Sequence, residues 1–204
     1  MSEKDEALKH LSEIKSALVD KETFFPYNYN ALMIWGVIGM IMTLFMGIIF
    51  KSSIFYGVVF SAILMSAGTI IEGFLTKEVN RDYDIEGCTK KQKFIVTIFG
   101  LLSFFAIALT ALLTKYELVV LAYPIWIFLI GIGHFSVGFI LNIKIIEFSS
   151  LLKIFVAILL LIASFFISDL GSLNSTFFYF VQGITFALLG VFPMLIGRKL
   201  KKEL

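Results

Sequence analysis

The hydrophobic pattern along the chain consists of six apolar blocks of about 20 residues, separated by short polar segments. A helix of about 20 residues rises about 30 Å, which matches the thickness of the hydrocarbon core of a bilayer. The alternation of apolar and polar residues that is typical of barrel strands does not occur in these blocks. The pattern therefore predicts six membrane-spanning helices, at about residues 30–50, 54–75, 94–114, 118–141, 149–168 and 176–197.

The composition supports the same class of protein. Of the 204 residues, 59% are hydrophobic and 16% are charged, and the mean hydropathy is +0.95. Soluble domains carry about 25% charged residues. The first 23 residues contain charges of both signs and no apolar signal-peptide core, so we expect the first span to stay in the protein as a signal anchor. The expected fold class is an all-α integral membrane protein, a six-helix bundle preceded by a short amphipathic helix.

The positions of lysine and arginine predict the orientation of the bundle. If the N-terminus lies in the cytoplasm, all of the 17 basic residues except Lys51 and Lys115 fall in cytoplasmic segments or beside them. Such an excess of positive charge in short loops marks the cytoplasmic side of a membrane protein. We therefore expect both termini in the cytoplasm and a location in the cytoplasmic (inner) membrane. Because the net charge of +2 follows from this topology, we expect no nucleic-acid partner.

The segment before the first span is expected to begin with a helix. Four apolar residues recur at the spacing of one narrow helix face: Ala7, Leu11, Ile14 and Leu18. Such a helix either lies on the inner leaflet or contacts a protein partner on the cytoplasmic side, including another copy of the chain. An aromatic lead-in then joins it to the first span. The expected organisation is a cytoplasmic segment 1–29, a membrane domain 30–197 and a basic cytoplasmic tail 198–204.

Small and polar residues are concentrated in the second, fourth and sixth predicted spans, whereas the fifth contains no glycine. Small side chains let helices approach closely in a membrane. We therefore expect spans two, four and six at the centre of the bundle. We expect the fifth span to face lipid, with Lys153 near its start reaching the interface. The glycines expected at close helix contacts are Gly68, Gly131, Gly138, Gly183 and Gly190.

His134 is the only histidine in the predicted spans, and it lies in the stretch GIGHFSVG. At 3.6 residues per turn, Gly131, His134 and Gly138 share one face of the helix. The imidazole therefore projects from a stripe that has room for another helix or for a bound group. An ionisable residue inside a membrane is a candidate functional residue.

Glu72 lies on a similar stripe of the second span, together with Ser61 and Gly68. Glu72 and His134 have comparable depths in the cytoplasmic half of the bilayer, so we expect them to meet. Either residue has a simpler alternative role, since Glu72 can reach the headgroups and a neutral His134 can bond a carbonyl or hydroxyl group. Ser61 and Gln182 complete the candidate ligand- or ion-binding residues, with Gln182 in the outer half of the sixth span.

The sequence contains few residues suited to covalent or metal chemistry. A metal site needs several convergent ligands, and His134 has no second histidine within the spans. Haem ligation would need a methionine or the His134 of another copy as the second ligand, so we expect no cofactor and keep haem as an alternative. Serine-nucleophile, phosphate-loop and dinucleotide motifs do not occur, so we expect no enzymatic activity. Cys88 is expected to be an incidental reduced thiol.

Around LAYPIWIFLIGIGHFSVGFILNIKIIEFSSLLKIF the chain resembles a group of small six-span bacterial inner-membrane proteins of unknown function. The resemblance lies in the charged N-terminal helix, the basic second loop and the spacing of glycines in the fourth and sixth spans. It implies a bacterial inner-membrane location, and it transfers no functional residue to this chain.

These observations favour a non-enzymatic membrane protein that binds or passes a small solute or ion between helices two, four and six. A membrane-anchored assembly or signalling subunit is one alternative, in which the N-terminal helix and second loop contact a partner or make a homo-oligomer. A haem- or quinone-binding redox subunit is the other alternative.

Overall fold

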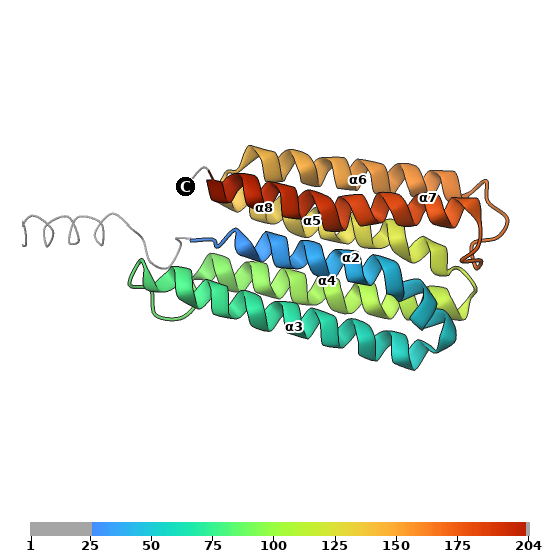
Figure 1. The fold of residues 1–204 in the computed structure, drawn as a ribbon, viewed down its shortest axis with the longest axis horizontal. Coiled ribbons are helices and arrows are strands. Elements are labelled where there is room, and N and C mark those ends of the chain that lie inside the picture. The colour runs from blue at the N-terminus through green and yellow to red at the C-terminus, as the bar shows by residue number, and fades with distance from the viewer. Residues whose placement is uncertain (1–25, 203–204) are drawn as a thin grey trace, which may run out of the picture.

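The computed structural model describes residues 26–202, which form helices and connecting segments without a β-strand. In chain order the helices are α2 (Asn30–Ser52), α3 (Ile54–Arg81), α4 (Lys90–Lys115), the short 3₁₀ helix η1 (Val119–Leu121), α5 (Ala122–Leu141), α6 (Lys144–Ser164), α7 (Thr176–Thr185), the π-helical segment η2 (Phe186–Val191) and α8 (Phe192–Lys202) (Figure 1). Among the described residues, six helical segments are long and apolar enough to cross a membrane. This confirms the all-helical fold with six helices of membrane-spanning length. The predicted N-terminal amphipathic helix lies outside the described residues.

Successive spans run in opposite directions, so both ends of the described chain lie at the same end of the bundle (Figure 1). There the Lys201 ammonium group donates a hydrogen bond to the Asn30 side-chain oxygen over 3.0 Å. The basic segment expected as a tail is helical as far as Lys202, because α7, η2 and α8 follow one another without a break. The sixth span and most of that tail are therefore one helical unit.

The most buried spans of the bundle are α5, α2 and the sixth span, which differs in part from the expected arrangement. Half of the most apolar stretch of Val119–Leu141 is buried, compared with 39% for α2, 39% for the sixth span (Thr176–Lys202) and 17% for α3. In Figure 1, α3 lies at the edge of the bundle and α2 runs between it and α8. The expectation that span two is central is therefore wrong. Its buried residues Gly57, Ser61 and Gly68 form one narrow contact face, and the rest of α3 is largely exposed.

The connection between α3 and α4 is closed by a pair of buried side-chain amides. Asn80 donates to Gln92 over 3.0 Å and Gln92 donates back to Asn80 over 2.8 Å. Gln92 also donates to the Pro26 carbonyl over 3.2 Å and forms a capping box with Thr89 at the start of α4. These contacts hold the aromatic lead-in segment against the end of the α3–α4 hairpin.

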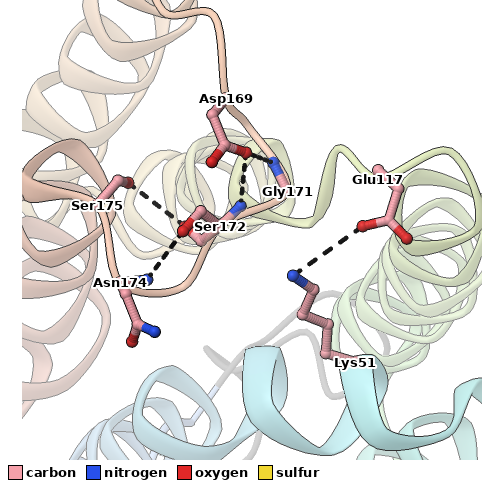
Figure 2. A network of polar contacts seen from close by, with 7 residues as sticks. All are labelled: Lys51, Glu117, Asp169, Gly171, Ser172, Asn174 and Ser175. Carbon is pink, nitrogen blue, oxygen red and sulfur yellow. Dashed lines mark hydrogen bonds and ion pairs between the residues drawn. The ribbon is translucent and has the colours of Figure 1, made fainter.

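The opposite end of the bundle is closed by the loop between α6 and α7 (Figure 2). The Asp169 carboxylate accepts hydrogen bonds from the backbone amides of Gly171 and Ser172 over 3.1 and 3.0 Å. Lys51, at the end of α2, lies 4.0 Å from the Glu117 carboxylate in the connection that precedes α5. These polar contacts hold the connecting segments in place at this end of the bundle.

Glycines set the closest helix contacts. A Cβ atom on Gly39 would overlap the carbonyl oxygen of Leu189 and lie 2.8 Å from its carbonyl carbon, so α2 and η2 touch backbone to backbone. A Cβ on Gly190 would likewise overlap the side chain of Met40. Gly68 faces Trp35 and Ile38 of α2. Gly183, by contrast, has open space around it, because a Cβ there would meet nothing within 4 Å.

Candidate functional site

His134 lies on the most buried helix of the bundle, and its glycine-flanked face packs on α6. A Cβ on Gly138 would lie 2.7 Å from the backbone nitrogen of Glu147, and one on Gly131 would lie 3.3 Å from the Cβ of Lys153. The two glycines therefore let α6 approach α5 closely. Lys153 from α6 consequently reaches His134, and its Nζ lies 3.2 Å from His134 Nδ1.

Lys153 does not reach the membrane interface as expected, because only 1% of its surface is exposed. The helix α6 begins at Lys144 rather than near residue 149, so Lys153 lies roughly 13 Å along the helix from its start. The ammonium group bonds inside the protein instead, donating to Ser149 Oγ over 3.0 Å in addition to contacting His134. No carboxylate among the described residues pairs with it.

His134 and Lys153 are called the basic pair below. Their hydrogen bond limits the number of protons that the two side chains can hold at the same time. Their contact joins two nitrogens, so one must donate a hydrogen and the other must accept it. The pair therefore cannot keep this bond with both groups fully protonated. Whichever group donates, the pair carries at most one positive charge while the bond is present. Phe99 lies beside the imidazole, with the ring centroids 5.9 Å apart.

A cavity of about 40 Å³, measured as the space open to the centre of a water molecule, adjoins His134. One water needs roughly 10–15 Å³ on this measure, so the cavity has room for about three. Its walls come from α2, α3, α4, α5 and η2: Trp35, Ile38, Gly39, Met42, Met65, Phe99, Ser103, Trp126, Ile130, His134 and Leu189. Trp35 and Trp126 are the two tryptophans of the chain, so both indoles border the same space.

The polar groups on this wall are mostly engaged elsewhere. The indole of Trp126 donates to Thr110 over 2.8 Å, and that of Trp35 donates to the Glu72 carboxylate over 2.7 Å. Ser103 Oγ lies 3.8 Å from the sulfur of Met65. The second ring nitrogen of His134, Nε2, has no hydrogen-bond partner among the described residues. Nε2 is therefore the polar atom of the basic pair that remains available to a molecule in the cavity.

Glu72 and His134 do not bond each other as expected. The glycine-flanked face of α5 packs on α6, and the Gly68 face of α3 packs on α2, so each residue finds a different partner. The Trp35 indole bonds Glu72 and also borders the cavity, and this is the link between Glu72 and the site.

Burial, followed by the charge of Glu72, raises the pKa of the Tyr27 hydroxyl well above its usual range. Tyr27 therefore stays neutral at this end of the bundle.

Replacing Glu72 with leucine is expected to lower the free energy of unfolding by about 1–3 kcal/mol, because the Trp35 indole N–H loses its acceptor. Glu72→Gln keeps an oxygen at the same position and is expected to cost less than half as much. Unfolding by sodium dodecyl sulfate in mixed micelles, followed by tryptophan emission, measures both. Equal losses for the two variants would show that the hydrogen bond is not what Glu72 contributes.

The remaining sequence candidates lie outside the cavity wall. The Gln182 amide donates to the Thr43 carbonyl over 3.0 Å and so joins α7 to α2. Ser61 is fully buried at the α3 contact face, and its hydroxyl has no partner among the described residues. Among residues 26–202 there is no group of three or more histidine, cysteine, aspartate or glutamate side chains that could hold a metal ion.

Sequence reasoning overlooked Lys153 as a site residue. A signal was present, because Ser149 and Lys153 are four residues apart and therefore share a helix face. Starting the fifth span at Lys144 would have placed that face inside the membrane. No protein-family model matches the chain, and neither the curated proteins nor the solved structures give a match.

Proposed function

We propose that this protein is a multi-pass membrane protein that binds a small solute or ion in the cavity beside His134. The observation that carries the proposal is the position of this cavity. It lies inside a bundle of membrane-spanning length, and a buried basic pair adjoins it. Packed protein interiors have few voids larger than a water molecule. Ionisable residues inside a membrane are costly and mark ligand and ion sites.

The distribution of lysine and arginine supports one orientation of the bundle in the membrane. At the end of the bundle that holds the described termini lie ten basic residues: Lys77, Arg81, Lys90, Lys91, Lys93, Lys144, Arg198, Lys199, Lys201 and Lys202. Lys51 and Lys115 lie at the other end. By the positive-inside rule we place the first end in the cytoplasm and the protein in the cytoplasmic membrane. The alternative of an assembly subunit relies on the N-terminal helix, which is outside the described residues, and on the second loop, which joins α3 to α4.

The two tryptophans make solute binding directly measurable. Purified protein in lipid nanodiscs is titrated with sodium chloride, sodium formate, ammonium sulfate and xenon, with ionic strength held constant by sodium sulfate. We expect at least one of these solutes to change tryptophan emission saturably. Ser103→Leu places a larger apolar side chain in the cavity and is expected to weaken that response at least tenfold.

Thr97→Leu is the matched control for this experiment. Thr97 lies on the same helix, is exposed, and bonds only its own helix through the Lys93 carbonyl. This variant should respond like the unmodified protein. The proposal would be rejected if no solute gives a saturable change, or if Ser103→Leu and Thr97→Leu respond alike.

A further inference from the structure

We propose that the solute bound beside His134 is a small monovalent anion, held as the counter-ion of the basic pair. This inference rests on the proposed function and specifies the chemical class of its ligand. It starts from an imbalance of charge in the interior. Lys153 is buried in a membrane-spanning helix, and no described carboxylate pairs with it or with His134. A buried ionisable group in a protein is paired or coordinated when it is charged, and otherwise becomes neutral.

When the basic pair is protonated, the hydrogen bond between its two nitrogens leaves one positive charge without a counter-ion among the described residues. When the Lys153 ammonium donates to Nδ1, the imidazole is neutral and carries its hydrogen on Nε2. When an imidazolium donates to a neutral Lys153 amine, both ring nitrogens carry hydrogen. In either state that holds the positive charge, Nε2 therefore has an N–H group. That group lacks an acceptor among the described residues.

The cavity suits an anion better than a cation. Nε2–H is a donor without an acceptor, and the Ser103 hydroxyl has only a long contact to the Met65 sulfur. Both groups can therefore donate a hydrogen bond to a bound acceptor. The wall provides no carboxylate, and the remaining wall residues are apolar or indoles whose N–H groups are already bonded. A small cation needs several oxygen ligands, which this wall does not supply.

The size of the cavity limits the anion. About 40 Å³ is the space of about three waters, which suits an ion of one to three non-hydrogen atoms better than a larger carboxylate. The Glu72 carboxylate is bonded to the Trp35 indole nitrogen, and Glu72 is not among the wall residues. The positive charge nearest to a bound ion is therefore the basic pair. Chloride and formate are representatives of this class.

The selectivity of the unmodified protein tests the inference without any substitution. In the tryptophan titration, chloride and formate are expected to give saturable changes, and acetate and benzoate to bind at least tenfold more weakly than formate. Ammonium sulfate is expected to give none. Saturable binding of ammonium or xenon without any response to chloride or formate would overturn the inference and leave the proposed function standing. If no solute at all binds, both fail.

Lys153→Met tests the source of the charge. It keeps an unbranched, flexible side chain that is one atom shorter and uncharged, and it is expected to weaken chloride and formate binding at least tenfold without weakening any response to xenon. Lys144→Met is the matched control, because Lys144 lies on the same helix but is exposed and pairs with Glu147. If Lys153→Met bound both anions as the unmodified protein does, the basic pair would not be their counter-ion and the inference would be overturned.

Discussion

Replacing Gly39 with alanine is expected to lower the free energy of unfolding of the bundle by about 3 kcal/mol. The added Cβ would overlap the Leu189 carbonyl oxygen and lie 2.8 Å from the carbonyl carbon. These are backbone atoms of η2, so no side-chain rotation relieves the overlap, and α2 must move away from the sixth span. Overpacking of a filled interior costs about 1–3 kcal/mol, and a backbone clash lies at the upper end of that range. Unfolding by sodium dodecyl sulfate, followed by tryptophan emission, measures the loss.

Gly183→Ala is the matched control for this prediction. Gly183 lies in the same span as η2, but a Cβ there would meet nothing within 4 Å. Alanine has a higher helix propensity than glycine, by about 1 kcal/mol, so this variant should be as stable as the unmodified protein or slightly more stable. Equal destabilisation by the two substitutions would contradict the idea that the α2–η2 contact is the tight one.

The number and positions of the spans could be predicted because bilayer thickness dictates their length. Which helices are central could be predicted only in part, because lipid and protein interiors are equally apolar and hydrophobicity does not separate them. The small residues of α3 mark where it touches α2, and they do not make α3 a central helix. Gly36 and Gly39 of α2 likewise mark a close helix contact, where they lie against Gly190 and Leu189.

The candidate site was also predictable only in part. The GIGHFSVG stretch identified the side of α5 against which another helix packs closely, and Gly131 and Gly138 lie at that contact. The neighbour is α6 rather than α3, and helix pairing of this kind has no local sequence signal. Lys153 was overlooked because a lysine near the end of a span ordinarily reaches the interface. Its burial depends on Gly131 facing it from another helix.

Removing His134 and removing Lys153 are expected to have strongly non-additive effects on stability. His134→Leu alone should cost about 3–5 kcal/mol, because the buried Lys153 ammonium loses one of its two partners and keeps only Ser149. Lys153→Met alone should cost less, at most about 1–3 kcal/mol. It leaves the unpaired acceptor Nδ1, but it also removes a buried charge. In the double variant neither an uncompensated charge nor an unpaired acceptor remains at the site.

The double variant His134→Leu/Lys153→Met should therefore be more stable than His134→Leu alone, which requires a coupling energy larger than the cost of Lys153→Met, about 3 kcal/mol. Unfolding by sodium dodecyl sulfate of the four proteins in this cycle gives that energy. His134→Leu combined with Lys144→Met provides the reference, because Lys144 is exposed and bonds Glu147, so the two effects should add. If the effects of the His134 and Lys153 substitutions were also additive, the two side chains would not be energetically coupled through a shared charge. The reason to expect an anion beside them would then be lost, although the cavity would still be present.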